Sequence, residues 1–257
     1  MTYDNLINVR DKAKALARKC NLDFYNHFSA ENSLSKEIFF SHPIIQRLRE
    51  DVLPFLNDGF GHGIEHSKMV AIDASVLAMI ETKHLYKPSE TKKICLLGQM
   101  CGLLHDISRQ DEDHAQKGAE FSRLILGDYP LTQEDRDDIA FAVSNHEAFK
   151  EVGNAENQRQ KILSDVLYDA DKFRWGPDNF ITTLWEICCY EEWTIDEIIQ
   201  RFPRGLEIIE KINETFRTQT GRIYGPEFIK CGLEVGGQVY RMLKEECFSE
   251  NVACSSS

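Results

Sequence analysis

Residues 101–120, CGLLHDISRQDEDHAQKGAE, place a histidine and an aspartate directly after an apolar run. Adjacent residues of a regular helix point about 100° apart, so His105 and Asp106 can serve one site only at a last helical turn, where the chain opens. A neutral imidazole and a carboxylate at such an end can both bind one cation. Asp106 fits equally well as a helix cap or as the partner of a basic residue in the polar segment that follows.

Other metal-binding residue types lie in separate helical segments. His66 falls in the first turn of an apolar segment, and His62 precedes it in a glycine-rich approach, where a rim or supporting position is expected. His114 begins another segment, and His146 lies near the end of a further one. A lone histidine is usually an ordinary, partly buried residue. The hypothesis of a metal site therefore depends on the convergence of the whole set.

The segment LSDVLYDADKFRW supplies two more carboxylates, Asp169 and Asp171. Aspartate is a poor helix former, so its presence in an otherwise apolar helical segment needs a reason. The two side chains are two residues apart and lie on different faces of a helix. One of the two is therefore expected to be a primary ligand.

The elements that must position these residues are helices. Apolar residues recur three and four positions apart along most of the chain, while alternating, strand-like runs are nearly absent. Helices are expected over 42–56, 66–81, 91–106, 114–126, 132–149, 158–173, 179–193, 195–202, 204–216 and 226–247. Pro88, Pro130, Pro177 and Pro226 are expected at junctions.

The pattern predicts one all-α domain over residues 1–257. Its core is expected at about 46–175, with accessory helices over 1–45 and 176–250 and softer junctions near 22–37 and 176–180. Residues 251–257 are polar and serine-rich, which predicts a disordered tail.

Composition limits the class of protein. The net charge of −12 argues against a binder of nucleic-acid polymers, although a small anionic substrate remains compatible because a local metal or arginine outweighs net charge at close range. The sequence lacks a long uninterrupted apolar stretch, so a cytoplasmic protein without a membrane span is expected. Eight scattered cysteines without CxxC spacing predict reduced thiols.

The order His66, His105-Asp106, Asp171 resembles the H…HD…D signature of the HD-domain superfamily of metal-dependent phosphohydrolases. The segments LLHDI and DADKF are similar to the LLHDIG and DADRL segments typical of that superfamily, over about residues 46–175. The resemblance implies an HD-like helical bundle with additional N- and C-terminal helices. It also assigns the last ligand to Asp171 and places Asp169 behind it. Ser108 departs from the glycine that usually follows HDI.

Members of this superfamily with two further histidines hold two metals, bridged by the aspartate of the HD pair. On this resemblance one metal is bound by His66, His105, Asp106 and Asp171, and the other by Asp106, His114 and His146. The alternative for His114 is a charged residue at a helix start. Mixed imidazole and carboxylate ligands suit Mn, Fe, Co or Zn better than Mg alone.

The resemblance implies hydrolysis of a small phosphorylated substrate, such as a nucleotide, by metal-activated water with Asp106 at the centre. Arg109 and Lys172 adjoin the ligands and can neutralise developing charge, or be solvated or salt-bridged. Glu65 and Glu147 also adjoin ligands, as proton shuttles or as solvated residues.

Two other functions stay open. The six ligands equally resemble those of HD-type diiron oxygenases, which cleave an organic substrate with dioxygen. A non-catalytic regulatory module with a structural metal is the third reading.

Three further features have structural interpretations. Trp185, Cys188 and Cys189 are expected in the core. Trp175 lines either the pocket or the core. Gly236 and Gly237 are expected to allow close helix packing or a bend.

Overall fold

The computed structural model describes residues 3–56 and 63–254, with side chains described over 6–56 and 63–245. Within those ranges every regular element is a helix, so the predicted all-α class is confirmed. The elements are α1 (Tyr3–Ala17), α2 (Asp23–His27), α3 (Ser29–Ser41), α4 (Pro43–Val52), η1 (Leu53–Phe55), α5 (Ile64–Thr82), α6 (Pro88–Leu104), α7 (His114–Ile125), η3 (Leu126–Asp128), α8 (Gln133–Ser144), α9 (Gln158–Phe173), η4 (Asn179–Thr183), α10 (Leu184–Tyr190), α11 (Ile195–Ile212) and α12 (Gln219–Cys254).

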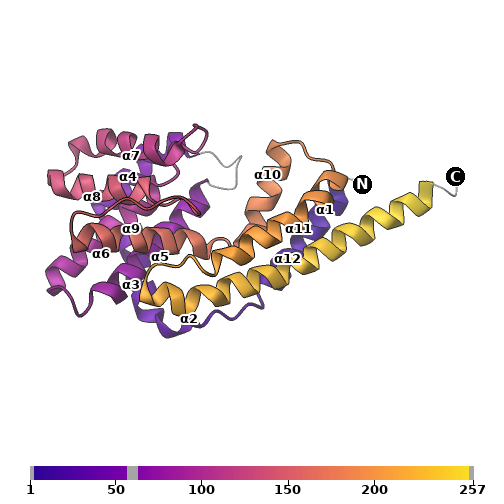
Figure 1. Ribbon diagram of the computed structural model, residues 1–257, viewed down its shortest axis with the longest axis horizontal. Coiled ribbons are helices and arrows are strands. Elements are labelled where there is room, and N and C mark those ends of the chain that lie inside the picture. The colour runs from indigo at the N-terminus through magenta and orange to yellow at the C-terminus, as the bar shows by residue number, and fades with distance from the viewer. Residues whose placement is uncertain (1–2, 57–62, 255–257) are drawn as a thin grey trace.

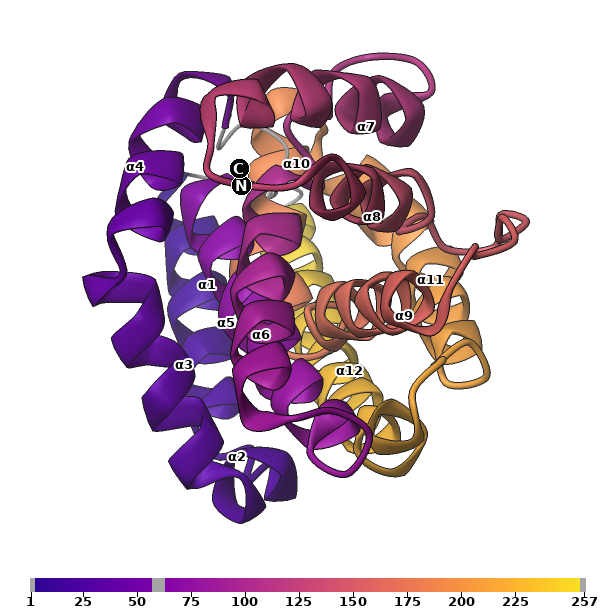
Figure 2. The same cartoon turned by 90° about the vertical axis from the view of Figure 1, so that its left-hand side faces the viewer.

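The core is a bundle built around α5, α6 and α9. Helices α5 and α6 lie side by side and α9 contacts both, while α7 and α8 pack on each other and cover one end (Figures 1 and 2). Apolar side chains of α5 and α6 are buried around most of each helix, as expected for helices enclosed on all sides. This arrangement brings one end of each of these helices to a common region.

A second group of helices lies beside this core. Helices α1, η4 and α11 contact α12, which runs as one long helix from the core to the far end of the molecule (Figure 1). The expected 204–216 and 195–202 helices form the single helix α11 with Pro203 inside it. Pro226 likewise lies inside α12, which begins seven residues earlier than expected, at Gln219. Proline removes one helical hydrogen bond, and packing of the flanking turns outweighs that loss here.

Residues 29–41, where the sequence predicted part of a softer junction, form the helix α3. Its side chains are tied to the core by polar as well as apolar contacts. The Ser35 hydroxyl donates to the Ile72 carbonyl at 2.8 Å, and the Gln99 amide donates to the Ser35 carbonyl at 2.7 Å. Tertiary contacts therefore stabilise a segment whose own periodicity is weak.

A buried ionic network joins the N-terminal segment to the core. The Arg174 guanidinium donates to Asp73 at 2.6 Å and to the Tyr25 hydroxyl at 2.8 Å, and it also pairs with Asp178 at 2.6 Å. Burial raises the pKa of Asp73, and the adjacent Arg174 opposes that rise. Loss of either buried partner leaves the other uncompensated, which is costly.

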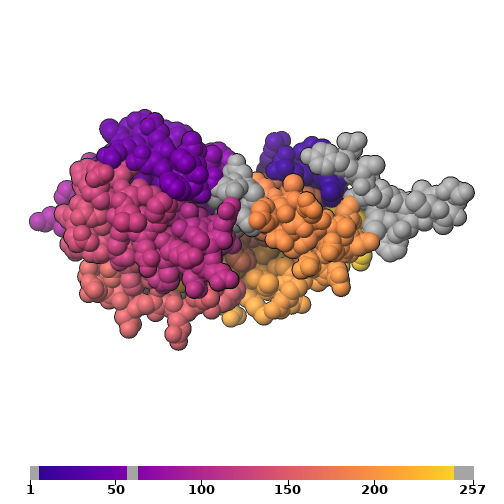
Figure 3. Space-filling model, turned by 90° about the horizontal axis from the view of Figure 1, so that it is seen from above, coloured from indigo at the N-terminus to yellow at the C-terminus, as the bar shows by residue number. Residues whose placement is uncertain are grey.

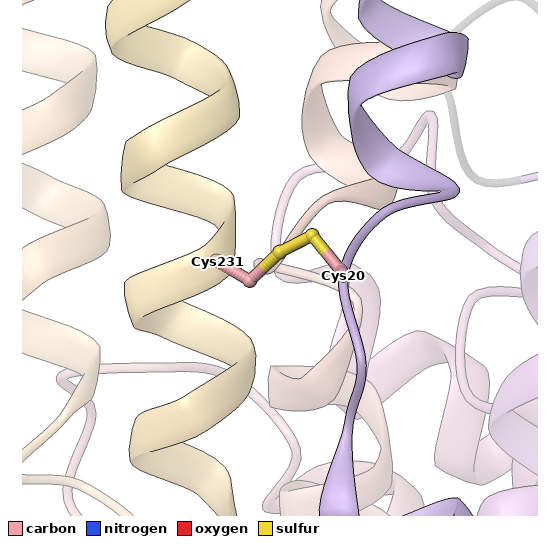
Figure 4. Close-up of a disulfide and its surroundings, with 2 residues drawn as sticks. All are labelled: Cys20 and Cys231. Atoms are coloured by element: carbon pink, nitrogen blue, oxygen red, sulfur yellow. A yellow bond between two sulfur atoms is a disulfide. The ribbon is translucent and has the colours of Figure 1, made fainter.

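Cys20 and Cys231 form a disulfide between the chain after α1 and the middle of α12 (Figure 4). Their Cα atoms are 6.2 Å apart, within the range that a disulfide spans. The expectation of reduced thiols is therefore wrong for this pair. Cys95, Cys101, Cys188 and Cys189 are free thiols.

The structure also bears on the expected core residues of α10, on the glycines of α12 and on the expected absence of a membrane span. Trp185 and Cys188 are buried as predicted, but Cys189 is exposed, because it lies on the outer side of α10. A Cβ atom at Gly236 would lie 2.4 Å from the Phe180 ring, so this glycine allows η4 to pack against α12. Gly237 has no such neighbour within 4 Å. Among the described helices, none combines the length and apolarity needed to cross a bilayer.

Candidate metal centre

Five helix ends bring the six predicted ligands together. His66 lies in the first turn of α5, His105 caps the C-terminus of α6 and is followed by Asp106, and His114 opens α7. His146 follows α8, and Asp171 lies in the last turn of α9. The side chains of all six are at most 12% exposed. The predicted end of α6 at His105 is what allows both members of the HD pair to face the same region.

One group of side chains consists of His66, His105 and Asp171. The Nε2 atom of His66 lies 3.2 Å from Nε2 of His105 and 3.3 Å from Oδ1 of Asp171. All three donor atoms lie within 4.8 Å of one another, close enough to bind one metal ion.

The second group consists of Asp106, His114 and His146, with the same limit of 4.8 Å between donor atoms. Oδ1 of Asp106 lies 3.4 Å from Nε2 of His146 and 3.8 Å from Nε2 of His114. Its other oxygen, Oδ2, lies 3.1 Å from Nε2 of His105 in the first group. Asp106 therefore presents one oxygen to each group, as a bridging carboxylate must.

Hydrogen bonds fix the orientation of three imidazole rings. Nδ1 of His105 lies 2.8 Å from the Gly102 carbonyl, and Nδ1 of His146 lies 2.6 Å from the Val143 carbonyl. A carbonyl only accepts, so each Nδ1 carries the proton and each Nε2 presents its lone pair to the cluster. Such outer hydrogen bonds, made by the ring nitrogen that faces away from the metal, are what metal-binding histidines usually have. His114 differs, because its Nε2 atom, which faces Asp106, accepts a hydrogen bond from Arg109 at 2.9 Å. A metal bound at this nitrogen would take the place of Arg109.

The electrostatics favour the protonation states that metal binding requires at His114 and Asp171 but not at His105. Burial acts to lower the pKa of His105, but the carboxylates of Asp106 and Asp171 outweigh it and raise that pKa. Burial, Arg109 and His146 lower the pKa of His114 to about 4, so its ring is neutral near pH 7. Burial acts to raise the pKa of Asp171, but Lys172 and His66 outweigh it and hold that pKa well below its usual value. Neutral imidazoles and ionised carboxylates are the ligand forms of these side chains.

The residues present fit a metal pair in chemistry as well as position. Four imidazole nitrogens and two carboxylates form a mixed nitrogen and oxygen donor set, which suits Mn, Fe, Co or Zn. A group of carboxylates and ring lone pairs this deeply buried needs a compensating cation. Lys172 supplies part of that charge, since it is 2% exposed and paired with Asp171.

Arg109 lies at the open side of the same cluster. Its side chain is 37% exposed and its Nη1 atom is 3.8 Å from Oδ1 of Asp106. Arg109 is thus salt-bridged to Asp106, and Lys172 is salt-bridged to Asp171. Arg109 is the more accessible of the two to an entering molecule.

Of the two glutamates that adjoin the ligands in sequence, Glu147 lies near the cluster and Glu65 does not. Glu147 Oε1 lies 3.8 Å from Nδ1 of His114, whereas Glu65 points to solvent and pairs with Lys68. Asp169 accepts hydrogen bonds from the backbone of Arg217 and Thr218, both at 2.8 Å, at the approach to α12. The expectation for His62 falls outside the described residues.

Sequence reasoning missed the contribution of the segment before α12. Arg217 lies over the Tyr168 ring, with its guanidinium carbon 3.6 Å from the ring centroid, and donates to the Asn145 carbonyl at 2.9 Å. This hydrogen bond fixes the backbone of Asn145, the residue before His146. No local sequence pattern predicts the contact, because Arg217 and Asn145 are 72 positions apart.

Comparison with known families agrees with this geometry. Residues 63–176 match the family model described as HD domain, a range that contains all six ligand positions. No curated protein and no solved structure matches the chain.

Proposed function

Because residues 63–176 match the HD domain family, we propose that this chain is a metal-dependent phosphohydrolase acting on a small phosphorylated substrate. The observation that carries the proposal is the position of Asp106, whose two carboxylate oxygens face two different groups of potential ligands. A bridging carboxylate is what a site with two metals requires.

The six candidate ligands would form two metal sites that share Asp106. His66, His105 and Asp171 would hold one metal and His114 and His146 the other, with Asp106 shared. Bound metals supply Lewis acidity and lower the pKa of a water molecule, so hydrolysis needs no protein nucleophile.

Protein side chains would supply the remaining charge and proton transfer. Arg109, exposed beside Asp106, would bind phosphoryl oxygens, since its planar guanidinium suits that geometry. Lys172 is already paired with Asp171, so it would balance the charge of the buried carboxylates. Glu147, next to His114, is placed to accept a proton from an outer water.

The test begins with metal analysis of the purified full-length protein. Metal-free protein would then be loaded with Mn, Fe, Co, Zn or Mg and assayed against phosphomonoesters and phosphodiesters. Asp106→Ala should abolish binding of the metal pair and lower turnover at least about a hundredfold, because metals contribute several kcal/mol to the barrier reduction. Asp111→Ala, at an exposed acid on the same connection, serves as the control.

The alternatives give different results in the same experiment. Oxygen consumption by iron-loaded protein without phosphate release indicates the diiron oxygenase. Bound metal without turnover of either kind indicates a regulatory module. Turnover that survives Asp106→Ala contradicts the proposed site.

A further inference from the structure

A cavity of about 320 Å³ lies beside the metal centre, between the core and the helices that follow α9. Its walls come from the end of α9, the π-helical η4, α10 and α11. Figure 3 shows the surface hollowed between the magenta part of the core and the orange α10 and α11. The volume is that of a small-ligand site.

The cavity adjoins the candidate metal centre. His66, a ligand candidate, and Arg109, the exposed guanidinium beside Asp106, both line it. Trp175 lines it as well, and its ring lies 5.6 Å from the Lys172 ammonium group. A molecule bound with its phosphoryl group at the ligands would therefore extend its other part into this cavity.

The wall is mostly apolar. Ten of the seventeen lining residues carry apolar side chains, including Leu184, Ile187, Trp193 and Phe202. Several of these are only half-buried, so they pack against the core and also present apolar surface to the cavity. Filling such a space with an apolar group removes apolar surface from water, which favours binding.

Three arginines line the cavity, and Arg109 is the one beside the candidate ligands. Arg109 supplies the positive charge there, whereas the Arg174 charge is offset by Asp73 and Asp178. Arg201 lies over the Trp193 ring, 4.6 Å from its centroid, and is exposed at the rim. The cavity thus has an anion-binding end and an apolar end.

We propose that this cavity binds the organic part of the substrate, and that this substrate is a phosphate ester of an apolar alcohol. The proposal rests on the proposed hydrolysis and names its substrate class. A sugar or nucleobase would bring several polar groups against a mostly apolar wall, whose uncharged polar side chains, apart from His66, are Asn179 and Thr183. Each buried polar group without a partner is costly. The π-helical turn η4, a feature often found at functional sites, forms part of that wall.

Turnover of phosphomonoesters that differ in their organic part tests the substrate class. For the metal-loaded protein, KM for 1-naphthyl phosphate should lie at least about tenfold below KM for glycerol 2-phosphate and AMP, as one or two buried apolar groups imply. The comparison uses KM because naphthol is a better leaving group than an alkanol, which raises kcat by itself. Leu184→Gln, at a half-buried wall position, should reduce that preference at least about fivefold. Leu85→Gln is the control, since Leu85 is 60% exposed and lies outside the cavity wall.

Binding without turnover separates this inference from the hydrolysis. Quenching of tryptophan fluorescence and calorimetry would follow 1-naphthyl phosphate added to chelator-treated protein, because Trp175 and Trp193 both line the cavity. Binding that weakens in Leu184→Gln but not in Leu85→Gln supports the cavity assignment even if no ester is hydrolysed. Preference for AMP or glycerol 2-phosphate, or naphthyl binding unchanged by Leu184→Gln, overturns it.

Discussion

Gly102 on α6 lies so close to Ala71 on α5 that a Cβ atom at residue 102 would come within 2.4 Å of the Ala71 Cα atom. The same glycine offers its carbonyl to Nδ1 of His105, at 2.8 Å. One residue therefore sets both the contact between the two central helices and the orientation of a predicted ligand. The position of the metal centre depends on the closeness of these two backbones.

Gly102→Ala should therefore lower stability and disturb the site together. The methyl group meets backbone atoms that cannot rotate away, so we expect a loss of about 1–3 kcal/mol in the free energy of unfolding. Urea unfolding and metal affinity by calorimetry measure the two effects. Gly237→Ala is the matched control, because its Cβ would meet nothing within 4 Å in another helix. Equal behaviour of the two variants contradicts the close-packing argument.

Lys172→Met should destabilise the metal-free protein more than the metal-loaded protein. Lys172 is buried and paired with Asp171, so its removal leaves a buried carboxylate without its cation, at a cost of about 3–5 kcal/mol. A metal bound by Asp171 restores a compensating charge. The measurement is the melting temperature with chelator and with Mn²⁺. An equal loss in both states would show that Asp171 does not bind the added metal.

Asp135, in the first turn of α8, makes the stability of the fold depend on pH in the acid range. It lies in a capping box with Thr132 and pairs with Lys93 at 2.8 Å and Arg159 at 3.0 Å. Burial acts to raise its pKa, but the hydrogen bonds from Lys93 and Thr132 outweigh it, so the pKa lies below its usual value. A depressed carboxyl pKa stabilises the fold above the unfolded-state pKa of about 4, and this contribution is lost as pH falls through the folded-state pKa.

Asp135→Asn should consequently be less stable than the unmodified protein at pH 7, by about 1–3 kcal/mol, and the difference should shrink below pH 4. Urea unfolding at pH 7, 5, 4 and 3 measures the difference. Glu207→Gln is the control, since its carboxylate is exposed and pairs with Arg204 three positions away. A difference that grows on acidification contradicts the sign of this linkage.

The sequence predicted six side chains that the structure brings together at the candidate metal centre, because their positions depend on local structure. An HD pair can face one site only at a helix end, and α6 does end at Leu104 with His105 as its cap. Hydrophobic periodicity likewise located the core helices. The breaks expected at Pro203 and Pro226 were wrong, because packing against neighbours holds both prolines within longer helices.

Hydrogen bonds between residues far apart in the chain could not be predicted from the sequence, for a different physical reason. The partner of Asp169 is the backbone at Arg217 and Thr218, and the partner of Asp73 is Arg174, 101 positions away. Neither pair shares a helix face or a spacing rule. The cavity beside the centre was also missed, since its wall is assembled from α9, η4, α10 and α11, whose apolar residues predict burial without showing what they enclose.

The Cys20–Cys231 disulfide predicts a redox-dependent stability. It closes a sequence separation of 211 residues and ties α12 to the N-terminal segment. A cross-link over so long a loop restricts the unfolded chain, which stabilises a protein by about 2–4 kcal/mol. Dithiothreitol should therefore lower the melting temperature of the unmodified protein but leave that of Cys20→Ser unchanged. Cys189→Ser, which removes an exposed free thiol, should still respond to the reductant. Alkylation of Cys20 and Cys231 in untreated, folded protein would show that the bond does not form.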